Sequence, residues 1–166
     1  MLKKVGQEKV VILGMGNLFR GDDGIGTHFV RMLNKDDLDY DNLEIIEGGI
    51  CPEFASFIED ADKLIIVDAI RGGKEPGTIY HLGIDDIAMD LAARSSVHQL
   101  GLVDSLKILR ILGREPRHTI IIGIEPKNTD CRLELSPEVK KGLTELRKIV
   151  MEEIKKTKSL PQFANS

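Results

Sequence analysis

Short, strongly apolar runs alternate along this chain with longer amphipathic stretches, and this alternation limits the possible folds more than any other feature. Residues 10–13 and 64–67 consist of Val, Leu and Ile, as expected of strands that are buried on both faces of a parallel sheet. The stretches between such runs are long enough to form crossover helices. The alternation therefore predicts an α/β fold, in which helices cover both faces of a mostly parallel sheet.

The alternation also predicts where each helix and strand lies. The fourth strand follows the third after a short connection, so we expect it either to pair antiparallel with the third strand or to lie at a sheet edge. Ser95 and Ser96 offer an N-cap for the third helix, and residues 157–166 are expected to fray. The predicted strands are residues 10–13, 43–46, 64–68, 78–82 and 119–124, and the predicted helices are residues 24–33, 52–60, 97–112 and 137–156.

Length and composition exclude several classes of protein. A chain of 166 residues with 42% hydrophobic and 30% charged residues is expected to form a single domain, residues 1–166. The net charge of −4 argues against a nucleic-acid-binding protein, which usually carries a basic patch. No apolar run reaches the roughly 20 residues of a membrane span, and no apolar signal-peptide core follows the first lysines. We therefore expect a soluble, cytoplasmic protein.

Polar side chains that act on a substrate in a parallel sheet usually lie just beyond the carboxyl ends of the strands. Asp22 and Asp23 occur there, near the N-terminus of a predicted helix, where free N–H groups and the helix dipole favour ionised carboxylates. Helix capping explains one of the two. Two adjacent aspartates are more than one cap needs, so we predict a functional role for at least one of them.

Asp68 and His98 are the other two candidates. Asp68 ends the most apolar predicted strand, where a carboxylate is partly desolvated and needs a partner or a metal; capping of the next turn explains it equally well. His98 lies in the first turn of its helix, where the dipole favours a neutral imidazole able to bind metal. Two carboxylates and one imidazole suit a divalent first-row metal ion. The remaining histidines are interpreted as structural: His28, His81 and His118.

Other common catalytic devices are missing from the sequence. It contains no His-Glu-x-x-His helix, no Gly-x-Ser-x-Gly elbow and no recognisable Cys–His motif. The two cysteines, Cys51 and Cys131, are too few for a disulfide framework, and Cys51 is interpreted as an inert thiol. The loop from Gly14 superficially resembles a dinucleotide-binding fingerprint, but Phe19 occupies the position of its third glycine. A nucleotide-binding module is therefore only an alternative.

Several segments, in this order, resemble the hydrogenase maturation endopeptidase family. The most specific is Gly14–Gly26, which looks like the family's N-terminal signature of Gly-x-Gly-Asn, an acidic pair and Gly-x-Gly. A second specific segment is His98–Gly101, with the sequence His-Gln-Leu-Gly. The resemblance covers about residues 9–153 and also includes Glu47–Gly49, Ile65–Ala69, Pro76–Thr78, Gly123–Pro126 and Leu135–Pro137.

This resemblance implies a fold and a reaction. The family fold is a three-layer α/β/α sandwich with a twisted, mostly parallel five-stranded sheet. The reaction is that of an endopeptidase, which removes the C-terminal extension of a nickel–iron hydrogenase large-subunit precursor after nickel has been inserted. The partner is thus the nickel-loaded precursor. Because the nickel belongs to that substrate, we expect the protease itself to be isolated without metal. We also expect a monomer, because one domain that acts on a larger protein needs no second copy.

The resemblance also implies site residues. The family binds nickel through an acidic residue, an Asp and a His, which correspond to Asp23, Asp68 and His98; some relatives have Glu at the first position. Substrate contacts are implied for Glu47, Gly48 and Gly49, although relatives have Asp where this chain has Glu47. The general base is not identified. A metal-binding chaperone that detects nickel without cutting is the alternative, since it would need the same ligands.

Overall fold

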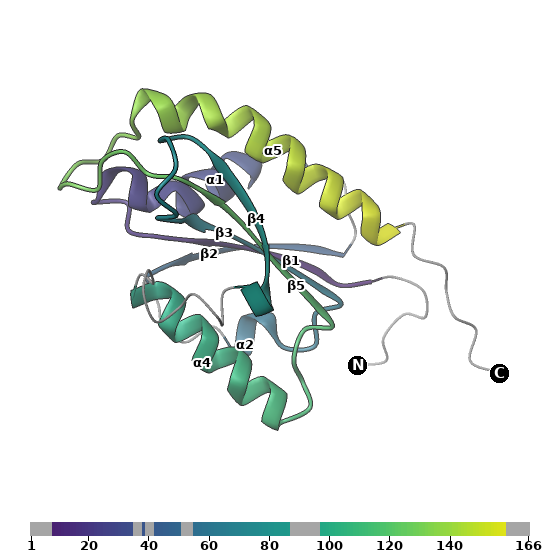
Figure 1. Ribbon diagram of the computed structural model, residues 1–166. Helices are drawn as coiled ribbons and strands as arrows, with labels where there is room; N and C mark the ends of the chain where they lie inside the picture. Colours follow the sequence, from purple (N-terminus) through teal and green to yellow (C-terminus); the bar gives the residue numbers. More distant parts are fainter. Residues whose placement is uncertain (1–7, 35–37, 39–41, 51–54, 87–96, 159–166) are drawn as a thin grey trace.

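The computed structural model describes residues 8–34, 38, 42–50, 55–86 and 97–158, and Figure 1 shows a central sheet with helices on both sides. The strand order is β2-β1-β3-β5-β4. Neighbouring strands among β2, β1, β3 and β5 run parallel, and β4 runs antiparallel to β5. The strands are β1 (Val10–Met15), β2 (Leu43–Gly49), β3 (Lys63–Ala69), β4 (Ile79–Gly83) and β5 (His118–Ile124).

β4 occupies an edge of the sheet, which is one of the two predicted positions. The other prediction, antiparallel pairing with β3, is wrong because β5 lies between the two strands. Ile122 of β5 pairs with Val67 of β3 on one side and with His81 of β4 on the other. The run of isoleucines in β5 is buried on both faces, whereas β4 is only partly buried. A strand that is apolar on both faces is stabilised most at the centre of a sheet.

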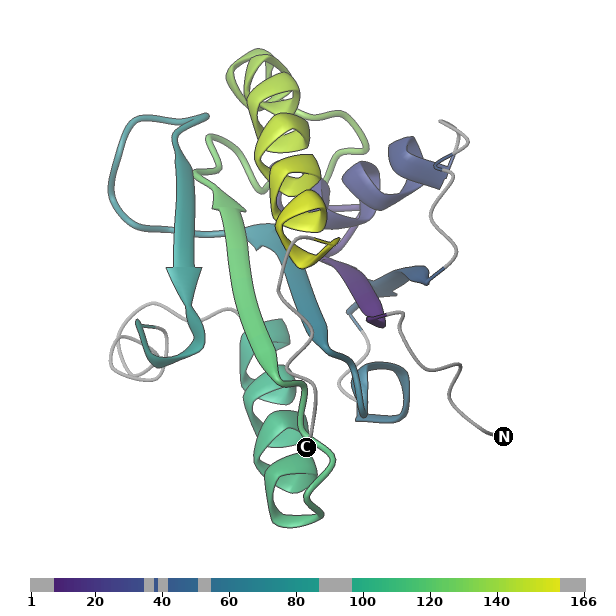
Figure 2. The same cartoon turned by 90° about the vertical axis from the view of Figure 1, so that its right-hand side faces the viewer.

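The helices form two layers on opposite faces of the sheet (Figures 1 and 2). One face is covered by α1 and α5, and the other by α2 and α4, which confirms the predicted α/β fold with a mostly parallel five-stranded sheet. A short 3-10 helix, η1, directly precedes α1. The bounds are η1 (Gly21–Gly24), α1 (Ile25–Asn34), α2 (Ala55–Ile58), α4 (Val97–Ile111) and α5 (Pro137–Lys158).

Side chains of the central strand β3 alternate between the two layers, as the period of a strand requires. Ile65 and Val67 belong to the apolar core under α1 and α5, whereas Leu64 and Ile66 belong to the core under α2 and α4. Asp68 follows Ile66 by two residues and so points to the same side as Leu64 and Ile66. Its carboxylate therefore lies on the face of the sheet that α2 and α4 cover.

The last helix is longer than predicted, and two other predicted helix starts lie partly or wholly outside the described residues. The expectation that residues 157–166 fray is wrong for its first two residues, because α5 continues to Lys158 and the buried Thr157 hydroxyl donates to the Glu153 carbonyl at 3.2 Å. Residues 159–166 lie outside the described residues. So do residues 52–54 at the start of the second predicted helix and the proposed N-cap at Ser95 and Ser96.

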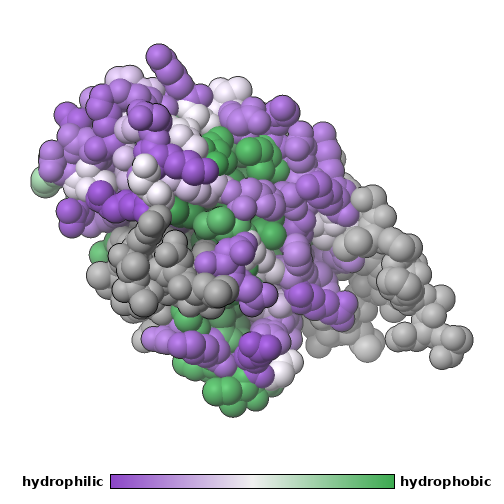
Figure 3. Space-filling view, in the orientation of Figure 1, coloured by the Kyte–Doolittle hydropathy of each residue, from purple (hydrophilic) through white to green (hydrophobic). Residues whose placement is uncertain are grey.

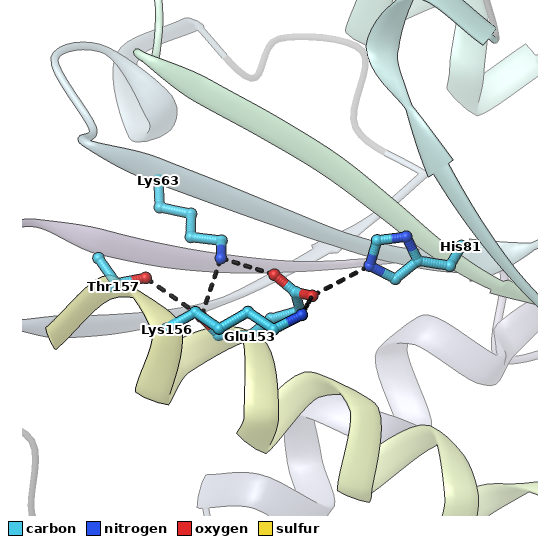
Figure 4. Close-up of polar contacts among 5 residues, drawn as sticks. All are labelled: Lys63, His81, Glu153, Lys156 and Thr157. Atoms are coloured by element: carbon cyan, nitrogen blue, oxygen red, sulfur yellow. Dashed lines mark hydrogen bonds and ion pairs between the residues drawn. The ribbon is translucent and has the colours of Figure 1, made fainter. Parts of the chain in front are cut away.

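A buried ion-pair cluster joins α5 to the sheet (Figure 4). The Lys63 ammonium group, at the start of β3, lies 2.7 Å from a carboxylate oxygen of Glu153 and donates to the Glu153 carbonyl at 2.8 Å. The other carboxylate oxygen lies 3.2 Å from His81 Nε2 and 2.7 Å from Lys156 Nζ. Burial raises the pKa of Glu153, but hydrogen bonds from Lys156 and Lys63 and the Lys63 charge outweigh it and lower that pKa to about 2.

The surface is mostly hydrophilic in the view of Figure 3, with hydrophobic residues gathered at the lower end of the molecule, over the C-terminal end of α4. Ile108, Ile111 and Leu112 are exposed there. None of the helices described is both long and apolar enough to cross a membrane. Cys131 is an exposed free thiol, and Cys51 lies outside the described residues.

Candidate functional site

Asp23 lies in η1, in the loop that leaves β1 and enters α1. Its carboxylate accepts a hydrogen bond from the Asn17 backbone N–H at 3.1 Å, which holds the side chain against the first turn of the loop. The residue is half-buried. The loop therefore orients the carboxylate of a residue that is not fully buried.

Two glycines of the Gly14–Gly26 segment allow this loop to fold back onto the sheet. Gly16 has a φ of +122°, and a Cβ atom there would lie 1.8 Å from the Asp23 carbonyl oxygen. A Cβ atom on Gly26 would lie 2.1 Å from the carbonyl oxygen of Val67 in β3. The glycines thus let η1 and the start of α1 approach β1 and β3 closely. They position Asp23 beside the end of the strand that carries Asp68.

Asp68 is 1% exposed, near the carboxyl end of β3. One carboxylate oxygen accepts a hydrogen bond from the Ala69 backbone N–H at 2.8 Å. Burying a carboxylate costs free energy unless polar groups or a cation stabilise it, so the burial of Asp68 makes it a candidate ligand for a cation. Because β1 and β3 are adjacent and parallel, Asp68 and the loop that carries Asp23 both lie at the carboxyl-terminal end of these strands.

His98 belongs to the first turn of α4, as predicted, and its side chain lies outside the described residues. The opposite end of α4 lies near the start of β3, because the chain beyond α4 bonds to that region: the Asp60 N–H donates to the Arg114 carbonyl and the Arg117 N–H to the Ala61 carbonyl. The first turn of α4 therefore lies toward the carboxyl ends of the strands, as Figure 1 shows. It covers the face to which Asp68 belongs.

The backbone thus brings Asp23, Asp68 and the first turn of α4 to the carboxyl-terminal end of the parallel strands. Two carboxylates and an imidazole from these elements fit a divalent first-row ion with open coordination positions. Within the side chains described, no group of three or more His, Cys, Asp and Glu residues lies close enough to hold a metal. That set does not include the His98 imidazole.

Asp22, the neighbour of Asp23, has a different environment. Its buried carboxylate accepts hydrogen bonds from the backbone N–H groups of Lys127 at 2.9 Å, Asn128 at 2.9 Å and Ser136 at 2.7 Å, and from the Ser136 hydroxyl at 2.8 Å. Burial raises the pKa of Asp22, but these hydrogen bonds outweigh it and lower that pKa. Asp22 therefore joins η1 to the loop between β5 and α5, which is a structural role.

The segment Glu47–Gly49 ends β2, beside β1. Both Glu47 carboxylate oxygens bind the Arg31 guanidinium, at 2.6 and 2.9 Å, and this hydrogen bonding lowers the pKa of Glu47. The Gly49 carbonyl accepts a hydrogen bond from the Gly16 N–H at 2.8 Å. The segment is thus connected to the Asp23 loop. The Glu47 carboxylate already has a partner within the chain.

The three histidines interpreted as structural occupy separate places. His28 lies half-buried in α1, where burial lowers its pKa. His81 contacts Glu153 from β4, and His118 is exposed at the start of β5.

Glu125 is a buried carboxylate that sequence reasoning did not single out. It follows β5 and accepts hydrogen bonds from the Gly72 N–H at 2.8 Å and from the Tyr80 hydroxyl. Burial and this carboxylate raise the pKa of Tyr80. Glu125 thereby fixes the loop that follows β3 and Asp68. The only sequence signal was its position in the segment Gly123–Pro126.

Comparisons with known sequences agree with this geometry. A sequence profile described as HycI, hydrogenase maturation protease, matches residues 27–153. The hydrogenase 2 maturation protease of Escherichia coli is 33% identical over 133 residues, which are 79% of this chain and 81% of that protein. A putative hydrogenase maturation protease of Methanocaldococcus jannaschii is 35% identical over 156 residues, 90% of this chain and 99% of that protein.

Other relatives are longer than this chain. The matches to the hydrogenase expression/formation proteins HupD of Thiocapsa roseopersicina and Bradyrhizobium diazoefficiens are 29% and 32% identical. They cover 87% and 71% of this chain but only 66% and 62% of those proteins.

Solved structures share the fold. The hydrogenase maturating endopeptidase HybD of Escherichia coli superposes with a TM-score of 0.84 at 29% identity, over 90% of this chain and 93% of that one. The nickel–iron hydrogenase maturation protease HybD of Thermococcus kodakarensis has a TM-score of 0.73 at 30% identity, over 87% and 98%. Sequence and fold together confirm the resemblance, and this chain belongs to the hydrogenase maturation protease family.

Proposed function

We propose that this protein is an endopeptidase that removes the C-terminal extension of a nickel–iron hydrogenase large-subunit precursor after nickel insertion. The observation that carries the proposal is the family match together with the common location of Asp23, Asp68 and the first turn of α4. The reaction takes place in the cytoplasm, and a monomer is sufficient because each candidate residue comes from the same chain.

Nickel enters this reaction as part of the substrate. Asp23, Asp68 and His98 bind the ion while the precursor's own ligands occupy its remaining positions, so the scissile peptide is held beside the metal. The ion polarises the scissile carbonyl or activates a water molecule next to it. The backbone of Gly48 and Gly49 contacts the substrate at the end of β2, with Glu47 held in place by Arg31.

Cleavage of a purified precursor tests the proposal. The full chain is incubated with nickel-loaded large-subunit precursor, and the products are analysed by mass spectrometry. The expected result is one released C-terminal peptide and a mature large subunit. Precursor that was never loaded with nickel serves as the control and is expected to remain intact.

The same experiment separates the protease from a metal-binding chaperone. A chaperone would form a complex with the nickel-loaded precursor, detectable by size-exclusion chromatography, and release no peptide. Complex formation without cleavage, on precursor whose nickel content has been measured, would overturn the proposed endopeptidase activity and support the chaperone.

A further inference from the structure

Two loops next to the candidate site are joined by backbone hydrogen bonds. The first loop follows β1 and contains Phe19 and Arg20, and the second lies between β5 and α5 and contains Arg132. The Arg132 N–H donates to the Phe19 carbonyl at 3.0 Å, and the Gly21 N–H donates to the Arg132 carbonyl at 2.7 Å. Arg20 and Arg132 are the paired residues of this isolated bridge. Phe19 and Arg20 from the first loop therefore lie beside Arg132 and Leu133 from the second, on the outer side of both loops.

The buried carboxylate of Asp22 holds these two loops together. The carboxylate of Asp22, one residue beyond Gly21, binds the second loop through the N–H groups of Lys127 and Asn128 and through Ser136 at the start of α5. Four hydrogen bonds to one buried carboxylate hold the two loops in a fixed relation. A surface built on such loops is ordered before a partner arrives, which reduces the entropy lost on binding.

Three arginines belong to these two loops or contact them. Arg20 Nε donates to the Thr129 carbonyl at 3.2 Å, and Arg71 donates from its terminal nitrogen to the Thr129 hydroxyl at 2.5 Å. Arg132 lies next to Arg20 in the bridge. In the part of the chain that the structure describes, no ion pair joins any of the three to a carboxylate. Exposed guanidiniums without an ion-pair partner in the described chain are available to carboxylates of another molecule.

Two large apolar side chains complete the surface. Phe19 is 68% exposed and Leu133 is 61% exposed, although each lies in an ordered loop. Exposed aromatic residues and arginines are enriched in protein-binding surfaces, where aromatic anchors are desolvated and guanidiniums pair with carboxylates. Single exposed apolar residues need no explanation, but Phe19 and Leu133 each adjoin in the chain an arginine that forms no ion pair within the described residues.

The surface lies close to the candidate metal-binding residues, which indicates that its partner is part of the substrate. Asn17, whose N–H binds the Asp23 carboxylate, is two residues from Phe19. Arg71 is three residues beyond Asp68. These loops therefore lie close to the residues that are proposed to hold the substrate. A C-terminal extension always ends in a carboxylate, which a guanidinium can bind through two parallel hydrogen bonds.

We propose that Arg20, Arg71 and Arg132, with Phe19 and Leu133, form the surface that binds the C-terminal extension of the precursor. The guanidiniums pair with carboxylates of the extension, including its terminal one, and an apolar side chain of the extension packs on Phe19 and Leu133. The inference rests on the proposed function, because the extension is the substrate segment of that reaction. It adds the segment's chemistry: acidic or terminal carboxylates beside an apolar residue.

Charge reversal tests this surface. Arg20→Glu combined with Arg132→Glu is compared with Lys141→Glu combined with Lys155→Glu, which makes the same change of net charge at exposed positions of α5. With nickel-loaded precursor, the arginine variant is expected to raise KM about tenfold with little change in kcat, since binding is lost and the metal-binding residues are intact. The lysine control is expected to match the wild type. Circular dichroism verifies that each variant folds.

A direct binding measurement separates this inference from the proposed function. A fluorescein-labelled synthetic peptide with the sequence of the extension is titrated with each full-length variant, and anisotropy is recorded. The free-acid peptide is expected to bind the wild type about tenfold more tightly than the arginine variant and more tightly than its C-terminal amide. This result, combined with no cleavage of nickel-loaded precursor, would support the surface and contradict the protease.

Other outcomes overturn the surface. Normal cleavage with the same KM in the arginine variant and the wild type would remove these arginines from substrate binding while leaving the proposed function intact. Equal peptide affinity for both proteins would do the same. Displacement of the peptide by a single-stranded oligonucleotide that binds more tightly would identify a nucleic-acid site instead.

Discussion

At the scale of single residues, Asp22 and Asp23 are adjacent in the chain and differ in what their carboxylates contact. Asp22 is fully buried and bound by Lys127, Asn128 and Ser136. Asp23 is half-buried, with the Asn17 N–H bound to one oxygen. The pair therefore provides a matched comparison between a structural and a candidate metal-binding carboxylate on the same short helix.

We expect the two asparagine variants to fail in different ways. Asp23→Asn removes the charge but keeps an oxygen for the Asn17 N–H, so cleavage of nickel-loaded precursor should be lost while Tm changes little. Asp22→Asn replaces an acceptor with a donor that faces backbone N–H groups, which should cost at least ~2 kcal/mol of folding free energy. Thermal unfolding and the cleavage assay measure both effects. Full activity in Asp23→Asn would remove Asp23 from the site.

The same comparison shows how far single residues can be interpreted from the sequence. The adjacent acidic pair, Asp68 at a strand end and His98 at a helix start were predicted because each has a local signal. The roles of Asp22 and Glu125 were not predicted, since Asp22 is bound by Ser136, 114 residues away, and Glu125 by Tyr80, 45 residues away. Contacts between such distant residues leave no periodic pattern in the sequence.

At the scale of elements, α5 depends on the buried pair of Lys63 and Glu153. Replacing Glu153 with Gln would leave the Lys63 ammonium group buried with no opposite charge, and such a change costs about 3–5 kcal/mol. We expect that loss in urea unfolding. The double variant Lys63→Met with Glu153→Leu is the control, because replacing both charges with apolar side chains should restore most of the stability. An undiminished stability of Glu153→Gln would show that the pair is not needed.

The same pair predicts a dependence of stability on pH. A carboxyl pKa lowered from 4.5 to about 2 in the folded state corresponds to roughly 3 kcal/mol of folding free energy. This contribution is complete above pH 4.5 and is lost as the pH falls toward 2, because the unfolded chain takes up the proton first. The Tm difference between wild type and Glu153→Gln should therefore narrow over this range. A difference that stays constant from pH 5 to pH 2 would contradict the lowered pKa.

Elements were predicted well where one face or both faces are strongly apolar. The segments that form β1, β3 and β5 each contain three or four consecutive Val, Ile or Leu residues, so their hydrophobicity identifies them as buried strands. The position of β4 was left between two possibilities because its pairing depends on β5, which comes about 35 residues later in the chain. A short connection brings two strands close but does not prevent a third from entering between them.

At the scale of the whole molecule, charge is distributed unevenly. The buried pair of Lys63 and Glu153 is neutralised inside the fold, and most of the ion pairs in the described chain lie on the surface. Arg20, Arg71 and Arg132 instead concentrate positive charge near the carboxyl ends of β1 and β3, in a protein that is acidic overall. These arginines add positive charge close to the candidate site, which attracts an acidic segment of a substrate.

This distribution predicts how the reaction responds to salt. Attraction between exposed charges is screened within about 10 Å at 0.1 M ionic strength, whereas direct contacts between a metal and its ligands are screened much less. Raising the ionic strength from about 0.05 M to about 0.5 M should therefore increase KM for nickel-loaded precursor several-fold and leave kcat nearly constant. In the variant with Arg20→Glu and Arg132→Glu the attraction has become repulsion, so added salt should lower KM. Equal salt dependence in this variant and in the wild type would mean that the three arginines do not contribute to the attraction, and that the precursor is held by the metal-binding residues alone.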